Sequence, residues 1–249
     1  MQDKPARVAR FYTDAALRAG GMALLPEDAA HHAVHVLRLR AGEEVALFNG
    51  RGGEYAGRIA AIERLRVTVD VLAHRALERE SPLAITLVQG VSSSEKMDFT
   101  VQKATELGVA ALQPVIAAHS VGRIAGERAA QKRAHWQRVA IAACEQCGRN
   151  RLPEVLSPLP LAEYCRAPAA PGKRLLLAPD APLGLREAAA RLKGAVALAA
   201  GPEAGFSAAE EAMLQEAGFV PVRLGPRVLR TETAALAALA ALNALAGDF

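Results

Sequence analysis

The sequence is poor in aromatic residues and in cysteine, and it has no long uninterrupted hydrophobic run. Only 4% of its 249 residues are aromatic, and three are cysteines. Three cysteines do not make a disulfide framework, and no apolar segment of a secretory signal follows the first residues. The longest apolar run, 234–246, is interrupted by Asn243 and is shorter than the roughly 20 residues that span a bilayer. These absences predict a reduced, cytoplasmic protein with an aliphatic core.

Charge is plentiful, but its excess is confined to one segment. The chain has 30 Lys and Arg against 26 Asp and Glu, a net charge of +4. Residues 96–151 carry nine basic and four acidic residues, whereas the segments on either side are close to neutral. A basic stripe of this kind suits a polyanion such as RNA, and a solvated helical face explains it equally well.

Residues 1–75 have the pattern of a small β-barrel. Four segments are rich in β-forming residues, and Asn49-Gly50-Arg51-Gly52-Gly53 supplies a turn among them. One helix is expected at about 26–37, because Pro26 and two acids form a favourable helix start. The expected strands are 7–12, 44–48, 54–62 and 66–72.

From about residue 83 the pattern changes to strands that alternate with helices. This alternation predicts an α/β domain with a largely parallel sheet, and the boundary falls near 74–82, where Pro82 breaks the pattern. Two capping boxes, at 92–95 and 207–210, mark helix starts. The expected strands are 83–89, 109–117, 175–178, 195–200 and 220–224. The expected helices are 96–107, 127–147, 207–218 and 231–246.

Three loops that follow expected strands are rich in glycine and proline. They are 178–180, 201–206 and 224–233. Ligands of open α/β sheets bind beyond the carboxyl ends of strands, and glycine lets a ligand approach the backbone closely. No GxGxxG followed by an acid and no GxxxxGK[ST] is present, so classical dinucleotide and P-loop sites are not favoured. The loops predict a site in which backbone groups hold a ligand, against the alternative of ordinary turns.

These loop sequences resemble those of a known family. Gly201-Pro202-Glu203-Ala204-Gly205-Phe206-Ser207, together with the stretch from Leu224 to Ala234, closely resembles the RsmE family of ribosomal RNA methyltransferases, which are of the SPOUT class. The resemblance extends through 102–109 and 145–149, and more loosely through the N-terminal half. It implies a PUA-like RNA-binding β-barrel in residues 1–75 and a knotted α/β methyltransferase domain, a SPOUT trefoil, in residues 76–249.

The resemblance also implies S-adenosylmethionine as methyl donor, a homodimer, and N3 of a uridine in 16S rRNA of the small ribosomal subunit as target. Related knotted enzymes that act on another RNA such as tRNA, and a non-catalytic RNA-binding assembly factor, remain alternatives. The family usually has glycine where this chain has Ala204, which would be strained if that position needs a positive φ. The residues expected to hold the cofactor are Leu177, Ala178, Ala200, Gly201, Pro202, Glu203, Gly205, Leu224, Gly225, Val228, Leu229 and Thr233.

The chemistry of uridine N3 indicates which side chains to look for. N3 carries a proton and is a poor nucleophile until that proton leaves, so a base or a cation that stabilises the uridinate would help. Arg230 is the candidate cation, and Glu232 or Glu203 is the candidate proton acceptor, unless these glutamates only cap helix starts. The residues expected to contact RNA are Arg10, Arg38, Lys96, Lys103, Arg123 and Arg149, unless they only provide solubility.

Two motifs raise the question of a metal. Cys144-x-x-Cys147 lacks the second ligand pair of a structural zinc site and falls on an apolar helix stripe, which favours core packing. His31, His32 and His35 share a helix but have no matching carboxylate pattern. We therefore expect no metal.

Overall fold

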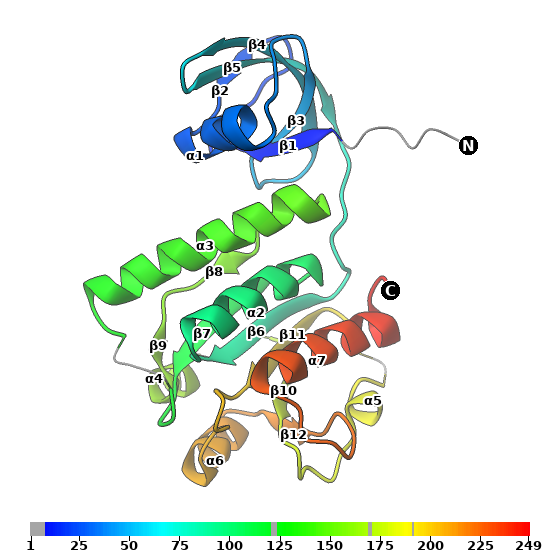
Figure 1. The fold of residues 1–249 in the computed structure, drawn as a ribbon. Coiled ribbons are helices and arrows are strands. Elements are labelled where there is room, and N and C mark those ends of the chain that lie inside the picture. The colour runs from blue at the N-terminus through cyan, green and yellow to red at the C-terminus, as the bar shows by residue number, and fades with distance from the viewer. Residues whose placement is uncertain (1–7, 121–123, 169–170, 191) are drawn as a thin grey trace. The chain divides into compact units, whose positions relative to one another are not determined.

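The computed structural model describes residues 8–120, 124–168, 171–190 and 192–249. Contacts within the chain define two units (Figure 1). The N-terminal unit runs up to Glu80 and also includes residues 144–152, and the C-terminal unit comprises residues 81–143 and 153–249. The sequence analysis placed the boundary after residue 75 and assigned 144–152 to the other domain.

The N-terminal unit is a curled five-stranded sheet, here called the barrel (Figure 1). Valines at 67, 69 and 71 are buried and the residues between them are more exposed, which is the period of two that a strand with one buried face requires. The first strand of the order is parallel to its neighbour and the remaining pairs are antiparallel. The strand order is β1 (Ala9–Tyr12), β3 (Glu44–Phe48), β4 (Glu54–Glu63), β5 (Arg66–Arg75) and β2 (Met22–Leu24).

The helix expected at 26–37 is present and consists of two successive helical segments of different type. It begins as α1 (Glu27–His31) after Pro26 and continues as a π-helical turn, η1 (His32–Val36). It ends at Val36 with Leu37 as its C-cap, and the following residue, Arg38, has a φ of 54°, in the left-handed region that usually favours glycine. Arg38 is exposed there.

A second part of the chain closes onto the barrel strands through polar contacts. In residues 144–152, a Glu145 oxygen accepts the Tyr12 N–H at 2.9 Å, and Arg149 pairs with Glu80 at 2.5 Å. The backbone oxygen of Arg149 accepts a bond from Arg10 at 3.1 Å. The 145–149 motif of the family resemblance therefore holds the barrel unit together.

Two arginines expected at RNA are used by this arrangement instead. Arg10 forms an ion pair with Glu54, in which both side chains are less than a tenth exposed, and bonds Asn150 Oδ1 at 2.7 Å. Arg149 is 4% exposed and faces Glu80. Because both guanidiniums are buried and paired, the structure does not offer either of them to RNA.

We expect Arg10→Gln to lower the free energy of unfolding by about 3 kcal/mol, because it leaves the buried Glu54 carboxylate without its main partner. Urea unfolding measures this loss. The matched change Arg58→Gln removes an exposed pair with Glu44 at 3.8 Å and should cost about 0.5 kcal/mol or less. Equal losses in the two variants would contradict the structural role of Arg10.

The C-terminal unit contains a parallel sheet with helices, as expected. Its strands are paired in parallel throughout. The strand order is β12 (Val220–Val222), β10 (Lys173–Leu177), β11 (Ala195–Ala200), β6 (Ala84–Gly90), β7 (Ala111–Ile116) and β8 (Glu154–Val155), with β9 (Leu159–Pro160) also on β7. The helices are α2 (Ser94–Glu106), α3 (Glu127–Cys147), α4 (Leu161–Arg166), α5 (Leu185–Ala188), α6 (Ala208–Glu216) and α7 (Thr231–Ala246).

The central strands of this sheet have continuous apolar sequences because both of their faces are covered. Leu87 of β6 packs in one hydrophobic cluster and its neighbour Val88 packs in another on the opposite face, and both are fully buried. Since β10, β11 and β12 are neighbours and parallel, their carboxyl ends lie at one edge of the sheet. The three glycine-proline loops are therefore brought together there.

The start of α7 lies against the loop that follows β11. Thr231 donates a hydrogen bond to the Gly201 carbonyl, and the Gln89 amide donates to both Gly201 O and Thr231 Oγ1 at 3.2 Å. A threaded C-terminal segment, as in the knot implied by the resemblance, requires this proximity.

Only one of the two expected capping boxes forms. Ser207 and Glu210 bond reciprocally at the start of α6, as predicted. Ser93 is the N-cap residue of α2 but makes no capping bond through its side chain, and its N–H donates to Glu203 instead at 3.0 Å. The serine-rich segment thus serves the loop after β11.

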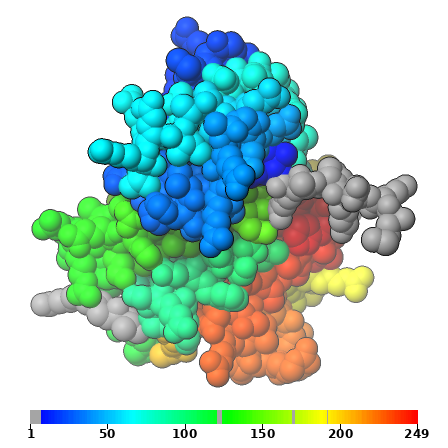
Figure 2. Space-filling view, turned by 45° about the horizontal axis from the view of Figure 1, so that its top comes forward, coloured from blue at the N-terminus to red at the C-terminus, as the bar shows by residue number. Residues whose placement is uncertain are grey.

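Figure 2 shows the surface, with the segment from α6 to α7 in orange and red. Apolar side chains remain exposed in this part of the chain, with Val228 at 81% and Leu245 at 45%. Within the residues that the structure describes, no helix has the length and apolar character needed to cross a membrane.

Candidate active site

A pocket of about 330 Å³ lies where the three loops meet. Every residue expected from the sequence to hold the cofactor lines it, with the exception of Thr233, which is exposed. Most of the other lining residues belong to the same loops or directly follow them, whereas Val222 ends β12 and Glu211 lies on α6, outside the loops expected from the sequence. The other lining residues are Pro179, Ala204, Phe206, Glu211, Val222, Arg227, Thr231 and Ala234.

The loop at 201–206 is tightly folded on itself. The Gly205 N–H donates to Pro202 O at 2.8 Å, and Gly205 has a φ of 76°. A Cβ on Gly201 would lie 2.9 Å from Gly205 C and Phe206 N, so this glycine is required by close backbone packing. Ala204 is not among the described residues with positive φ. The family's glycine at this position is therefore replaced without backbone strain.

The end of β6 supports this loop from the neighbouring strand. A Cβ on Gly90 would come within 2.5 Å of the Pro202 nitrogen. Beside it, Gln89 is 2% exposed, and its amide nitrogen contacts Gly201 O while its Oε1 has no partner among the described residues. The close contact between Gly90 and Pro202, together with the hydrogen bond from the Gln89 amide to Gly201 O, fixes the position of the 201–206 loop relative to the sheet.

Glu203 is held in place by two neighbours from α2. Its Oε1 accepts the Ser93 N–H at 3.0 Å and lies 3.5 Å from the Lys96 ammonium. Burial alone would raise the pKa of this carboxyl, but the Ser93 hydrogen bond and the Lys96 charge outweigh it, so the pKa is lowered. Glu203 is therefore ionised at neutral pH, and a lowered pKa makes it a weaker base.

Glu232 is in a different environment. Its side chain is 15% exposed, and Oε2 is buried with no hydrogen-bond partner among the described residues. The Lys96 ammonium lies 4.0 Å from this oxygen, which is longer than a hydrogen bond. Of the two candidate proton acceptors, Glu203 lines the pocket and has a paired Oε1, whereas Glu232 lies beside the pocket and has an Oε2 without a hydrogen-bond partner among the described residues.

Arg230 and Glu232 flank Thr231, which lines the pocket. Arg230 is the N-cap residue of α7, is exposed, and forms no ion pair with any described residue. A cation and a carboxylate thus stand beside a pocket of mostly backbone and apolar groups. This arrangement suits a nucleoside-like ligand next to a reaction that moves one proton.

The remaining basic residues expected at RNA differ in availability. Lys96 bridges the two glutamates, and Lys103 pairs with Glu106 at 2.8 Å. Arg38 is exposed and available. Arg123 lies outside the described residues.

Of the two cysteines that raised the question of zinc, Cys144 is buried and Cys147 is partly exposed. A hydrogen bond with Cys147 and burial raise the pKa of the Cys144 thiol, so it remains protonated.

Family models match both parts of the chain. An RNA methyltransferase domain matches residues 79–243, and an RNA methyltransferase PUA domain matches residues 25–72. The fold and the pocket therefore define an RNA methyltransferase of the expected class, with a PUA-like domain before a parallel-sheet α/β domain.

Individual relatives specify the family further. The ribosomal RNA small subunit methyltransferase E of Buchnera aphidicola is 32% identical over 97% of this chain and 98% of its own length. The crystal structure of the Neisseria gonorrhoeae protein of that name, bound to S-adenosylmethionine, has a TM-score of 0.89 at 39% identity and covers 98% of this chain and 100% of its own. A Legionella pneumophila methyltransferase with bound cofactor matches with the same TM-score at 38% identity, over 98% of this chain and 100% of its own. The chain belongs to the ribosomal RNA small subunit methyltransferase E family.

Proposed function

We propose that this protein is an S-adenosylmethionine-dependent methyltransferase that modifies N3 of a specific uridine in 16S ribosomal RNA. The observation that carries the proposal is the pocket formed by the three loops, flanked by the available carboxylate of Glu232. Its volume of about 330 Å³ lies in the range of small-molecule sites. Glycine at 201 and 205 keeps the loop compact enough to leave backbone groups facing the pocket.

The residues present fit the cofactor. Leu177, Gly201 and Leu224 represent the three loops that would hold it, mainly through backbone polar groups and apolar contacts. When bound, S-adenosylmethionine supplies a methyl group on a positively charged sulfonium, which is already activated for in-line displacement. The protein's main contribution is therefore to position the uridine and to manage the proton on its N3.

The side chains beside the pocket divide this work. The Glu232 carboxylate takes the N3 proton as the N3–methyl bond forms and later releases it to solvent. Arg230 stabilises the negative charge that develops on the uracil ring. Lys96 positions both glutamates. The ionised Glu203 carboxylate anchors the 201–206 loop to the start of α2 through the Ser93 N–H.

The proposal includes the partners and the place of action. Relatives named as ribosomal RNA small subunit methyltransferases point to 16S rRNA, free or within the small subunit, as the partner. Ribosomal subunits of bacteria occupy the cytoplasm, and we place the activity there. The barrel is expected to contact RNA, and the exposed Arg38 is one of its available cations.

We also propose a homodimer formed by exposed apolar residues of the C-terminal unit. Phe99 on α2 and Leu245 on α7 are 46% and 45% exposed, on two helices that pack together. Sedimentation should give about twice the 26.2 kDa chain mass, and Phe99→Glu with Leu245→Glu should shift it towards one chain. Leu65→Glu, an equally exposed leucine of the barrel, should leave it unchanged. A wild-type monomer at micromolar concentration would contradict this arrangement.

Nucleoside mass spectrometry tests the function itself. Deletion of the gene should remove 3-methyluridine from 16S rRNA, and expression of the chain should restore it. Loss of a modified nucleoside from tRNA instead would favour the related tRNA enzymes. Normal 16S methylation together with a defect in subunit assembly would favour the non-catalytic factor.

A further inference from the structure

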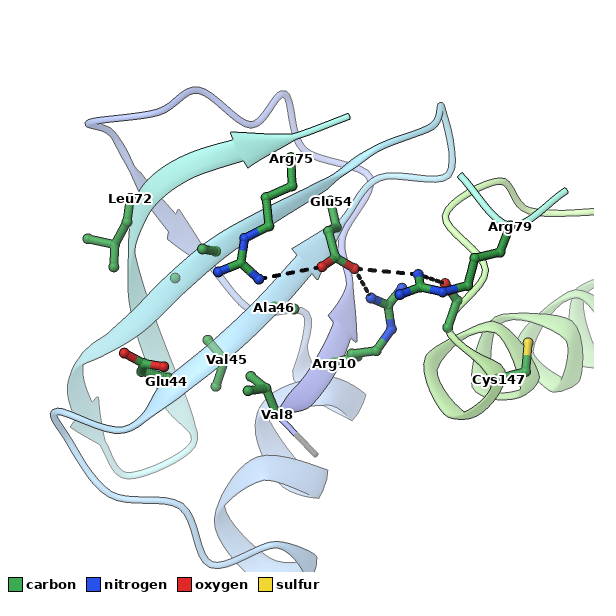
Figure 3. A pocket seen from close by; sticks show the side chains of 13 residues that line it. Val8, Arg10, Glu44, Val45, Ala46, Glu54, Leu72, Arg75, Arg79 and Cys147 are labelled. Carbon is green, nitrogen blue, oxygen red and sulfur yellow. Dashed lines mark hydrogen bonds and ion pairs between the residues drawn. The ribbon is translucent and has the colours of Figure 1, made fainter. Parts of the chain in front are cut away.

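The barrel unit contains a second and larger pocket, of about 670 Å³, which the cofactor chemistry does not use. Strands β1, β3, β4 and β5 form most of it. The flanking residues Val8 and Arg79, the last residue of α3 (Cys147) and Gly148 complete it, and all of these belong to the N-terminal unit. Figure 3 shows its side chains, with three arginines arranged around Glu54.

The charges that line this pocket do not cancel. Arg10 neutralises the buried Glu54, and Glu44 at the rim is paired with Arg58 at 3.8 Å. Two further guanidiniums remain: Arg75 lies 3.8 Å and Arg79 lies 3.9 Å from Glu54. The described lining residues therefore carry three positive and two negative charges, and Arg58, which lies outside the lining, offsets the charge of Glu44.

These two guanidiniums keep most of their hydrogen-bonding capacity. The side chains of Arg75 and Arg79 are 62% and 44% exposed, and their distances to Glu54 are too long for hydrogen bonds. One Arg79 nitrogen donates to Gly148 O at 2.8 Å. Because each guanidinium has five N–H donors in a fixed fork, both can still bind an oxyanion.

The rest of the lining is apolar and contains no aromatic ring among the described residues. Val8 and Leu72 are 41% and 48% exposed. Without a ring to stack on, the pocket cannot read bases in the way that single-strand binders do. Its chemistry suits a phosphate with an aliphatic contact to the adjoining ribose.

We propose that Arg75 and Arg79 bind a backbone phosphate of the RNA substrate in this pocket, with the neighbouring ribose against Leu72. The proposal rests on the function proposed above, since an RNA methyltransferase must hold a polyanion. Glu54 keeps the two arginines at the mouth of the pocket, and Arg10 offsets the charge of Glu54. The contact is independent of sequence and positions the RNA rather than selecting the uridine.

Salt dependence of RNA binding tests the pocket directly. With a short oligouridylate as probe, Arg75→Gln with Arg79→Gln should weaken binding about tenfold and flatten the slope of log affinity against log salt by roughly 0.7, as the loss of one single-strand phosphate contact requires. The matched variant Arg18→Gln with Arg66→Gln removes the same charge from exposed barrel positions outside the pocket. It should keep the wild-type slope. Equal slopes in the two double variants would overturn the proposal.

Two further measurements distinguish binding of RNA in the pocket from instability of the double variant and from binding of a free anion. Arg75→Gln alone leaves the Arg79 bond to Gly148 intact and should give about half of the change in slope, even if the double variant is unstable. Inorganic phosphate at constant ionic strength separates the sources of the oxyanion. If the pocket variants lose phosphate binding but keep oligouridylate binding, the site takes a free anion and the proposal is wrong.

Methylation of small subunits separates this inference from the proposed function. The pocket variants should raise KM for the subunit about tenfold and leave kcat and S-adenosylmethionine affinity unchanged, because no residue of the cofactor pocket is altered. A wild-type protein that methylates no RNA would defeat the proposed function, while the oligouridylate slopes would still decide the role of Arg75 and Arg79.

Discussion

Gly201→Val is expected to abolish measurable S-adenosylmethionine binding, with an affinity loss of at least about 100-fold, or roughly 3 kcal/mol. A Cβ at this position would lie 2.9 Å from backbone atoms of Gly205 and Phe206. Backbone atoms cannot move aside as a flexible side chain can, so the turn from 201 to 206 must open. Isothermal titration calorimetry with the cofactor measures the loss.

A matched glycine in the same unit provides the control. Gly184, the N-cap residue of α5, has a φ of −80°, and a Cβ there meets nothing within 4 Å. Gly184→Ala should therefore bind the cofactor as the wild type does, whereas Gly201→Ala should already weaken binding. Unchanged affinity in Gly201→Val would mean that the loop does not shape the pocket.

The pocket was predictable because its signal is local. Each loop follows a short apolar strand, and parallel strands bring their carboxyl ends to one edge, so residues such as Gly201 and Gly225 could be assigned from sequence alone. Thr233 was assigned by the same reasoning, but it lies within the first turn of α7 and is exposed. Loop membership does not specify which side of a helical turn faces a ligand.

The roles of the basic residues could not be predicted from the sequence, because their acidic partners lie far away along the chain. Arg10 faces Glu54 and Arg149 faces Glu80, across 44 and 69 residues of sequence. Lys96 meets Glu203 and Glu232 in the same way. Charge counts and helical spacing identify a basic residue, but they do not reveal an acid that folding places beside it.

The shortest elements were missed for a different reason. Strands β8 and β9 have two residues each, and α5 has four. Two residues are a single period of a strand and four are barely one turn of a helix, so hydrophobic patterning cannot reveal them. The two strands form because β7 of the larger sheet supplies a paired edge for both.

The second large effect is expected at Glu232. Glu232→Gln should lower kcat by about 10²- to 10⁴-fold, the range for loss of a general base, and leave cofactor affinity unchanged. The reason is that its buried Oε2 has no partner among the described residues and stands one residue from the pocket-lining Thr231. Single-turnover methylation of small subunits, with thermal unfolding as a check on folding, measures the change.

Glu203→Gln provides the comparison, because the Glu203 carboxylate already accepts the Ser93 N–H and faces Lys96. It should weaken cofactor binding through the loop and reduce kcat less than Glu232→Gln does. The reverse order would assign the proton to Glu203 and contradict the role of Glu232.

A substrate change distinguishes proton removal from a structural role of Glu232. An electron-withdrawing fluorine at C5 of the target uridine makes its N3 proton easier to lose, so the reaction needs the base less. RNA that contains 5-fluorouridine should therefore restore much of the rate of Glu232→Gln, while having little effect on a variant with a distorted pocket such as Gly201→Val. Arg230→Ala should show an intermediate response, since the fluorine also stabilises the negative ring that this cation faces. If the fluorinated substrate rescues none of the Glu232→Gln rate, Glu232 is a structural residue and the N3 proton leaves by another route.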